Sequence, residues 1–435
     1  MSSETVLVES IASSAKNSVV GGPFGSNLVS KDYVSDGVPV IRGQNMGDKW
    51  VGGEFVFVSN DKARALEPNK ARPGDLVFTQ RGTLGQVAIV PLAPYSEYIV
   101  SQSQMKLTPD PDKADVNYLY YAFLSPEQQD YIRNTAIQTG VPHTNLGILK
   151  KTPIALPAIS VQREIGRVLG ALDDRITLLR ETNATLEAIA QALFKSWFVD
   201  FDPVRAKQEG RAPEGMDETT AALFPDSFEE SELGLVPKGW RVAPLDGIAN
   251  FLNGLALQKF PPKNEDDWLP VIKIAQLRKG DTAGADRASS NIKQEYIVQN
   301  GDVLFSWSGS LEVEIWCAGT GALNQHLFKV SSSDFPKWFY FFWTRQHLPN
   351  FQQIAASKAT TMGHIQRKHL TEAKVVVPNE AVMTVASGVF EPLFEQLINN
   401  ALQAQTLATL RDTLLPRLIS GQLRLPEAEA MLAKV

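Results

Sequence analysis

The sequence predicts an α+β protein in which two mixed α/β domains are separated by a pair of long antiparallel helices that form a coiled coil. Three observations predict this fold. The chain has 435 residues, which is enough for at least two domains. Apolar sequences in the first half recur in the second half. Each copy is followed by a long heptad pattern, so the chain contains an internal two-fold pseudo-repeat.

The repeat has a period of about half the chain. Four short sequences recur at offsets of 231, 227, 220 and 221 residues. The pairs are Pro39–Ile41 and Pro270–Ile272, Gly74–Phe78 and Gly301–Phe305, Tyr118–Tyr121 and Trp338–Phe341, and Ile154–Pro157 and Val375–Pro378. A period of this length excludes a solenoid of small stacked units and indicates a duplicated domain.

Each copy begins with short apolar segments separated by Gly and Pro, which is typical of strands in a compact domain. In the first copy these segments are Val38–Ile41, Asp75–Thr79, Gln86–Val90 and Met105–Leu107. A helical stretch follows in each copy, near Asn117–Asn134 and near Trp338–Ile354. We therefore expect mixed α/β domains at residues 1–157 and 238–378.

Long heptad patterns follow the two copies. Apolar residues recur in alternating steps of four and three, and the second pattern keeps the register of the first at an offset of 221. The apolar seam residues are Leu169, Leu172, Ile176, Leu179, Leu186 and Leu193 in the first pattern, and Phe390, Leu393, Leu397, Leu407, Leu414 and Leu418 in the second. Neither seam could stay exposed to water, so we expect the helices at residues 158–201 and 379–421 to pair with each other.

Polar residues mark the ends and the middle of the two predicted helices. Ser160 and Asn379 are candidate N-caps, and Gly421 follows the second helix. Asn183 and Asn400 fall on the apolar seams. A buried Asn fixes the register of a coiled coil, whereas a seam position that leans towards solvent needs no partner. The sequence favours neither alternative.

Charge is unevenly distributed along the chain. The formal net charge is -6, which taken alone disfavours nucleic-acid binding. Residues 205–235 contain three basic and eight acidic side chains, a net -5, and lie in a Pro- and Gly-rich segment at 202–237 that we expect to be a linker with little regular structure. Residues 337–374 contain six basic side chains and one acidic, a net +5 that fits either a nucleic-acid surface or a solvated face. Residues 422–435 would form a tail.

The sequence lacks the motifs of several enzyme classes. It contains no G-x-x-x-x-G-K-[ST] loop, no G-x-G-x-x-G loop and no Asn- or Asp-Pro-Pro-aromatic sequence. Five scattered histidines and the single cysteine, Cys317, predict neither a metal site nor a disulfide. We therefore expect no catalytic residues and no cofactor in this chain.

The sequence also predicts the compartment. The first residues lack a basic segment followed by an apolar run, so we expect no signal peptide. No stretch approaches the roughly 18 apolar residues that a membrane helix needs. Together with the single cysteine, these features predict a cytoplasmic protein that does not contact a membrane.

Five sequences resemble those of one family, the specificity subunits of type I restriction-modification systems. They are Gly22–Ser26, Gly74–Phe78, Leu193–Phe201, Leu235–Trp240 and Leu414–Gly421, and they extend over nearly the whole chain. The family plan is a target-recognition domain and a conserved helix, each present twice. The second copy departs from the first, because Asn253-Gly254 stands where Gly22-Pro23 would be.

The resemblance implies a function and a set of partners. Each target-recognition domain would read one half of a bipartite site in double-stranded DNA. Two modification subunits, which bind S-adenosylmethionine, would dock on the helices and methylate adenines. Restriction subunits, which use ATP and Mg²⁺, would join that core. None of this chemistry would belong to the present chain.

Side chains that read bases in the major groove are mainly Arg, Lys, Asn and Gln. Two polar loops after predicted strands, and two segments matched between the copies, are candidates for DNA contact. The candidate residues are Gln80, Arg81 and Thr83; Ser306 and Trp307; His143 and Asn145; and Lys358, Thr360, His364, Gln366, Arg367 and Lys368. The alternatives are exposed turns for the loops and structural roles for the matched segments, because domains that read different sequences should differ where they touch bases.

Two other classes of function stay open at this point. The chain could be a stand-alone regulator that binds a bipartite DNA site, or a coiled-coil scaffold without a DNA function. Tight, specific DNA binding by the purified chain alone would favour the regulator.

Overall fold

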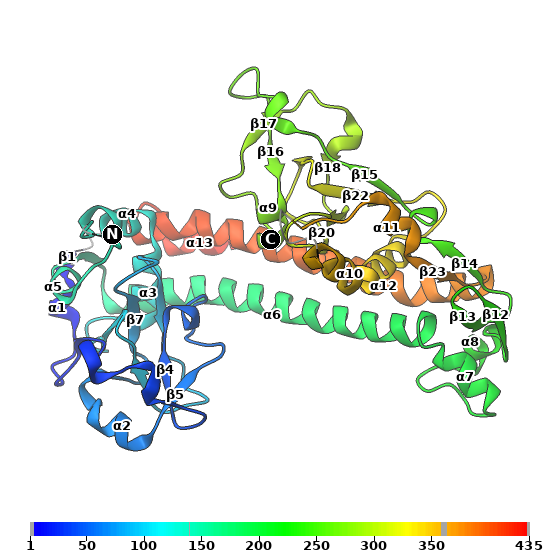
Figure 1. The fold of residues 1–435 in the computed structure, drawn as a ribbon. Helices are drawn as coiled ribbons and strands as arrows, with labels where there is room; N and C mark the ends of the chain where they lie inside the picture. The colour runs from blue at the N-terminus through cyan, green and yellow to red at the C-terminus, as the bar shows by residue number, and fades with distance from the viewer. Residues whose placement is uncertain (1–3, 139, 358–362, 433–435) are drawn as a thin grey trace. The chain divides into compact units, whose positions relative to one another are not determined.

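The computed structural model describes residues 4–138, 140–357 and 363–432 (Figure 1). The chain forms two compact units. One unit contains the chain up to Arg175 together with the segment from Leu407 onwards, and the other runs from Ile176 to Thr406. Each unit therefore combines one globular domain with one half of each long helix.

The first globular domain contains two main sheets. A four-stranded sheet has the order β2-β10-β7-β8, a five-stranded sheet has the order β3-β5-β4-β9-β6, and β1 pairs with β11. The strands are β1 (Glu4–Leu7), β2 (Val19–Gly21), β3 (Tyr33–Val34), β4 (Val38–Ile41), β5 (Val56–Val58), β6 (Lys70–Ala71), β7 (Leu76–Thr79), β8 (Val87–Ile89), β9 (Tyr98–Val100), β10 (Gln104–Leu107) and β11 (Pro153–Leu156). The helices are α1 (Val8–Ile11), α2 (Asn60–Ala65), α3 (Val116–Leu124), α4 (Pro126–Thr135) and α5 (Leu146–Lys150).

The second globular domain contains sheets with the orders β15-β22-β19-β20 and β17-β16-β21-β18, and β14 pairs with β23. The strands are β14 (Arg241–Pro244), β15 (Asn250–Asn253), β16 (Trp268–Ile272), β17 (Arg287–Ser289), β18 (Ile297–Val298), β19 (Val303–Ser306), β20 (Val313–Ile315), β21 (Gly321–Leu323), β22 (Leu327–Ser331) and β23 (Lys374–Val377). The helices are α9 (Ile274–Lys279), α10 (Lys337–Ser357) and α11 (Arg367–Glu372).

The two domains share one topology. The order β15-β22-β19-β20 repeats β2-β10-β7-β8, and β17-β16-β21-β18 repeats β5-β4-β9-β6. The parallel pair β16–β21 corresponds to the parallel pair β4–β9. The predicted duplication of a mixed α/β domain is therefore confirmed, and the four strands expected in the first copy are found as β4, β7, β8 and β10.

The repeated Gly-Asp sequence shows why these residues recur. Gly74 has a φ of +87°, a left-handed conformation that side chains with a Cβ disfavour. The next residue, Asp75, lies 3.0 Å from Lys106 Nζ, and both side chains are buried. This ion pair joins the turn before β7 to the neighbouring strand β10. The second domain repeats it with Gly301, Asp302 and Lys329, at φ +85° and 2.8 Å.

The two long helices are α6 (Ile159–Phe198) and α12 (Glu380–Ile419), and each has 40 residues. In the second unit, Asn183 Nδ2 donates to Leu397 O at 2.8 Å and Asn400 Nδ2 donates to Asn183 Oδ1 at 2.9 Å. Further along α6, the Phe194 ring lies 6.4 Å from the ring of Phe390, which comes earlier in α12. The helices are therefore antiparallel, and the seam Asn residues are paired rather than turned to solvent.

Most of the predicted seam residues are buried. Those with exposures below a tenth are Leu169, Leu172, Ile176, Leu179, Phe390, Leu397, Leu407, Leu414 and Leu418. Leu186, Leu193 and Leu393 are only half-buried. Phe394, the residue after Leu393, is buried and provides the packing that was expected of Leu393.

The ends of the helices match the predictions in part. Asn379 is the N-cap of α12, because its Oδ1 accepts from Val382 N at 2.9 Å. Ser160 is not the N-cap of α6, because the helix begins at Ile159 and Ala158 O accepts its first backbone hydrogen bonds. Gly421 follows α12 with a φ of +75°, as expected.

The segment at 202–237 is not the unstructured linker that its composition predicts. It contains α7 (Asp202–Gln208), α8 (Glu218–Leu223) and a hairpin of β12 (Phe228–Ser231) and β13 (Gly234–Pro237). Val204, Phe224 and Val236 are buried in the core of the second unit. These scattered apolar residues anchor the segment although most of its side chains are polar. The expected tail contains a further helix, α13 (Leu425–Leu432).

By length and average composition, α12 passes the test for a membrane-spanning helix, with a mean hydropathy of 1.2 over its most apolar 18 residues. The expectation that no stretch comes near this level is wrong. Some of the apolar residues of α12, such as Phe390 and Leu414, are fully buried within the protein, although only 28% of the apolar window is buried. Its polar seam residues Asn400 and Arg411 pair with side chains of α6.

Candidate nucleic-acid interface

In the first domain, three loops meet at the end of β7. Arg81 and His143 form an isolated antiparallel bridge, and Thr144 N donates to Gln80 O at 2.9 Å. Gln80 N also donates to Ser103 O at 2.7 Å. The backbone thus brings together the predicted loop after β7, the predicted segment before α5 and the loop between β9 and β10.

The second domain repeats this junction. Ser308 and His364 form the bridge, and Ile365 N donates to Trp307 O at 3.0 Å. Trp307 N donates to His326 O at 3.3 Å. The same three loops therefore converge in both domains, held by equivalent backbone hydrogen bonds.

A glycine lets two backbone segments approach closely beside each junction. A Cβ on Gly22 would lie 1.8 Å from Ser101 O, and a Cβ on Gly254 would lie 2.2 Å from Asn324 O. Both distances are far below van der Waals contact, so only glycine fits either position. Gly254 is therefore the counterpart of Gly22, and the expected alignment of Asn253-Gly254 with Gly22-Pro23 is wrong by one residue.

Two of the predicted contact residues stabilise the loop of the second domain instead. Ser306 is fully buried, its Oγ donates to Ser310 O at 2.7 Å and it accepts from Glu312 N at 2.7 Å. The expectation that Ser306 contacts DNA is wrong, because this side chain is occupied within its own loop. Trp307 is half-buried, and its Nε1 donates to Asn253 Oδ1 at 2.9 Å.

The matched segments before α5 and α11 also have a structural role. Asn145 is the N-cap of α5, since its Oδ1 accepts from Ile148 N at 2.9 Å. Gln366 occupies the N-cap position of α11, and its backbone N donates to His369 Nδ1 at 3.0 Å. The fold alone therefore explains why these positions match between the copies. Any contact of Asn145 or Gln366 with DNA stays a prediction.

Exposed polar side chains remain on the junction of the first domain. Arg81 and Thr83 are both exposed, and Arg81 lies on the bridge between two of the three loops. A guanidinium in this position can reach a phosphate or the O6 and N7 atoms of guanine. Gln80 and His143 are half-buried beside it.

In the second domain, the predicted contact residues that carry an exposed charge lie on α11. Lys368 is exposed. Arg367 is also exposed, but its Nη2 donates to Phe251 O at 3.1 Å, so this guanidinium is partly engaged within the domain. Lys358 and Thr360 lie outside the described residues, and their predicted role is not addressed by the structure.

One pair of positions was missed from sequence. Gln86 and Glu312 stand immediately before the equivalent strands β8 and β20. Gln86 Oε1 accepts from Thr79 Oγ1 at 3.0 Å, and Glu312 Oε1 accepts from Arg278 Nε at 2.8 Å. Both side chains are half-buried. The hairpin of the second domain is one residue shorter, which hid the correspondence.

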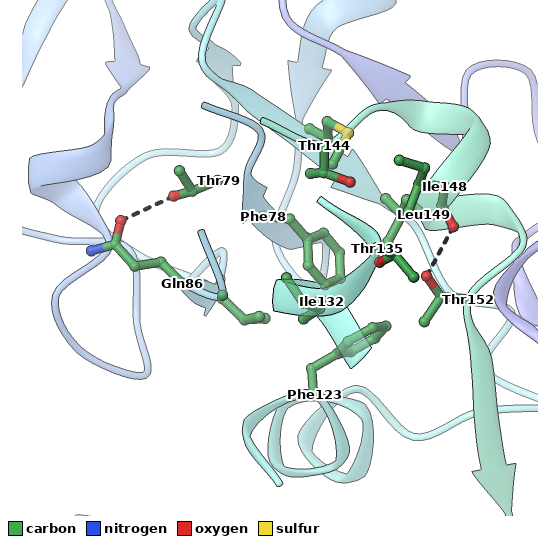
Figure 2. A pocket seen from close by; sticks show the side chains of 13 residues that line it. Phe78, Thr79, Gln86, Phe123, Ile132, Thr135, Thr144, Ile148, Leu149 and Thr152 are labelled. Carbon is green, nitrogen blue, oxygen red and sulfur yellow. Dashed lines mark hydrogen bonds between the residues drawn. The ribbon is translucent and has the colours of Figure 1, made fainter. Parts of the chain in front are cut away.

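A small cavity lies behind the hairpin of the first domain (Figure 2). It is lined by the rings of Phe78 and Phe123 and by the side chain of Ile132. Thr79 and Gln86, which are joined by a hydrogen bond, also line it (Figure 2). Its volume of about 30 Å³ holds about one water molecule. The cavity is therefore too small for a nucleobase turned out of a DNA helix.

Comparisons with known proteins identify the repeat. A family model described as "Type I restriction modification DNA specificity domain" matches residues 32–188 and again residues 237–404. Each match begins within or just before one globular domain and extends into the long helix that follows it. The two matches coincide with the internal duplication of the fold.

Individual relatives agree with the family match. The chain is 25% identical over 424 residues to the type I restriction enzyme MjaIX specificity subunit of Methanocaldococcus jannaschii, which covers 94% of this chain and 92% of the relative. It is 23% identical over 449 residues to the HindI specificity subunit of Haemophilus influenzae, over 92% and 97% of the two chains. The solved S subunit of the type I restriction-modification system of M. genitalium superposes with a TM-score of 0.52 at 16% identity, over 96% of each chain. This last likeness supports the fold.

Proposed function

Because the chain belongs to the type I restriction-modification DNA specificity family, we propose that its two domains read the two halves of a bipartite site in double-stranded DNA. Each domain would place its three-loop junction against one half-site. The chain would supply sequence recognition, and its partner subunits would supply the chemistry.

The observation that carries this proposal is the contrast between backbone and side chains at the two junctions. The backbone hydrogen bonds are equivalent, but the side chains on them differ. The pairs are Gln80 and Trp307, Arg81 and Ser308, and Gln86 and Glu312. Gln86 and Glu312 bond Thr79 and Arg278 in the structure, and to read a base they would exchange these partners for adenine N6 and N7 and for cytosine N4. A common frame with different side chains is what two readers of different half-sites require.

Exposed positive charges support the same surfaces. Arg81 is exposed in the first junction, and Lys368 is exposed beside the second. These two charges are few for a protein with a net charge of -6. Since phosphate contacts supply much of the affinity for DNA, we expect the modification subunits to contribute most of them.

The test is DNA binding by the assembled complex with Arg81→Ala or Lys368→Ala, measured at several salt concentrations. Loss of a base contact should cost about 1–3 kcal/mol and relax one position of the site. Loss of a phosphate contact should instead lower the salt slope by about 1 without a change in preference. Lys238→Ala is the matched control, because Lys238 is exposed after β13, outside both junctions.

If both variants bind like the parent at every salt concentration, the two junctions do not face DNA. If the chain alone binds one bipartite site as tightly as the complex does, a stand-alone regulator becomes the better description. If neither the chain nor the complex prefers any sequence, a scaffold role would replace the proposal.

Two modification subunits are the expected partners of the helix pair. Most of the predicted seam residues are buried, so docking would use the outward faces of the helices. Leu178 and Ile189 are exposed by 51% and 47%. They are 11 residues apart, about three turns, and so lie on one face of α6. Restriction subunits would join the resulting core.

We expect the chain itself to be non-catalytic. S-adenosylmethionine would bind in the modification subunits, and ATP and Mg²⁺ in the restriction subunits. The complex would work in the cytoplasm on DNA, without a membrane contact. Methyl transfer or DNA cleavage by the purified chain, above the level of an inactive preparation, would contradict this expectation.

A further inference from the structure

The duplication creates a choice of partner for each long helix. The heptad patterns of α6 and α12 share one register at an offset of 221 residues. Because equivalent seams can pair, the α6 helices of two chains have a route to pair with each other, and so do two copies of α12. The observed pairing joins the two different helices, and two polar contacts on the seams are present only in this pairing.

An ion pair is the first distinguishing contact. In the first unit, Arg411 of α12 donates from Nη1 to Asp173 Oδ1 of α6 at 2.6 Å. The Asp173 side chain is 15% exposed and that of Arg411 is 29% exposed. Tyr121 of α3 donates to the second oxygen of Asp173. Burial alone would lower the pKa of Arg411, but its bond to Asp173 raises it overall, so the guanidinium stays charged.

The equivalent site in the second unit is apolar. At the offset of 221, Asp173 corresponds to Phe394 and Arg411 corresponds to Ala190. Phe394 and Ala190 are both buried, at 4% and 1% exposure. Tyr121 corresponds to Phe341 at the offset of 220 seen for its own segment, and the rings of Phe341 and Phe394 lie 5.2 Å apart. The equivalent position is therefore occupied by a charged pair in the first unit and by a phenylalanine and an alanine in the second.

A second contact follows the same pattern. Asn183 and Asn400 hydrogen-bond across the seam, and Asn400 is buried at 5% exposure. At the offset of 221 their counterparts are Ala404 and Leu179, which are both buried and apolar. Both polar pairs thus exist only when α6 meets α12.

We propose that the Asp173–Arg411 and Asn183–Asn400 pairs select pairing between α6 and α12 over self-pairing of either helix. In a self-paired α6, Asp173 would face Ala190 and Asn183 would face Leu179. In a self-paired α12, Arg411 would face Phe394. Each arrangement leaves a partly buried charge without its partner across the seam, although Arg411 keeps Asp412 at 2.7 Å and Asp173 keeps Tyr121. The lost pair should weaken pairing on the order of 10-fold or more. The polar pairs thereby keep the two halves of one chain together in their observed order.

The first test compares the parent with a chain whose seams are made equivalent. The five substitutions Tyr121→Phe, Asp173→Phe, Asn183→Ala, Asn400→Leu and Arg411→Ala copy each apolar counterpart onto the polar position. The parent and the five-fold variant both carry a protease site between Gly210 and Arg211, which are exposed. Each protein is prepared in two batches that differ in their N-terminal tag. The folded chains are cleaved, and the two tagged batches of each protein are mixed. The mixture is unfolded in urea and refolded by dilution. Native mass spectrometry then counts the pairs of N-terminal and C-terminal halves.

The parent should return only pairs of an N-terminal with a C-terminal half. The equivalent-seam chain should also return pairs of two N-terminal halves, at a level approaching random association. Abundant pairs of two N-terminal halves in the parent would overturn the proposal. Exclusive N-to-C pairing in the equivalent-seam chain would overturn it as well, since other contacts would then set the choice.

The second test uses the intact chain and does not depend on cleavage. Asp173→Arg and Arg411→Asp should each lower the urea midpoint. The double reversal should recover part of the loss, because the pair is restored with its charges exchanged while the neighbouring Lys49 and Asp412 still favour the native charges. Arg175→Asp, a charge reversal at an exposed position two residues from Asp173, is the control and should change the midpoint little. If the double reversal loses as much as the two single variants combined, the two charges do not act as a pair.

Discussion

The two globular domains join the same helix pair by different chemistry. In the first unit, a tyrosine hydroxyl and two charges make directed contacts, because Asp173 of α6 joins Tyr121 of α3 to Arg411 of α12. In the second unit, aromatic rings occupy the corresponding space. The Phe390 ring stacks on Trp338 of α10 at 4.6 Å and 15°.

Aromatic rings surround Phe390 throughout the contact between the second globular domain and the helix pair, which we call the joint of the second unit. Phe390 also lies within 6.4 Å of several other rings of α6 and α10, which include Phe194, Trp197, Phe198 and Phe342. Its counterpart in the first unit is the smaller Leu169. Directed polar contacts specify one geometry and weaken as salt rises, whereas packed rings depend on buried area. The comparison shows that a duplicated fold can keep its topology while its joints diverge.

Removal of the central ring should have the largest effect. Phe390→Ala leaves a cavity among rings that cannot close it, so we expect a loss of about 3–5 kcal/mol in the free energy of unfolding. Urea denaturation measures this loss, which should be the same at low and high salt. Leu169→Ala is the matched change in the first unit, with an expected loss of about 2–5 kcal/mol. A loss below about 1 kcal/mol for Phe390→Ala would show that the ring cluster does not stabilise the joint.

Removal of the charged partner should have an intermediate effect. Arg411→Met leaves the Asp173 carboxylate with Tyr121 as its remaining side-chain partner, and we expect a loss of about 1–3 kcal/mol because the pair is only partly buried. The loss should shrink as salt rises, in contrast to Phe390→Ala. Arg175→Met, at an exposed position of α6 two residues from Asp173, should have almost no effect. A salt-independent loss for Arg411→Met would remove the distinction between the two joints.

A titrating carboxyl in the second unit should have the smallest effect. Burial, together with the nearby Glu312 carboxylate, raises the pKa of Glu314 to about 7 from its ordinary 4.5. The folded state then holds this proton more tightly than the unfolded state does. The resulting stability is full below pH 4.5 and is lost as the pH rises towards 7.

Glu314→Gln should abolish this part of the pH dependence of unfolding. The effect should stay under about 1 kcal/mol, because the side chain is 44% exposed and Arg345 Nη2 lies 3.9 Å away. An unfolding free energy that rises between pH 5 and pH 7 in the parent, and not in the variant, would have the wrong sign for this explanation.

Local signals account for the parts of the fold that the sequence predicts. Asn379 caps α12 through a bond to a residue three positions away, and such caps are visible in sequence. The prediction of Ser160 as an N-cap was wrong because the backbone carbonyl of Ala158 accepts the first hydrogen bonds of α6, without a side-chain cap. The prediction of a linker at 202–237 was wrong because this segment is ordered by contacts of Val204 and Phe224 with residues distant in sequence, which composition does not reveal.

The candidate interface was predictable only in its backbone. Matching of the repeats paired the loop of Arg81 with that of Ser308 and the segment of His143 with that of His364, and in each domain the fold brings the loop and the segment together. The direction of each side chain was not predictable, because a polar residue such as Ser306 can satisfy either its own loop or a ligand. The pairing of Gln86 with Glu312 required the strand registers.

If the two repeated domains read separate half-sites, each domain should be exchangeable without the other. Exchange of residues 1–157 for the equivalent domain of a related specificity subunit tests this when methylated adenines are mapped in a host that carries the modification subunits. One half of the methylated sequence should change, and the other half should stay as in the parent. A change in both halves, or in neither half of an active complex, would contradict independent reading by the two domains.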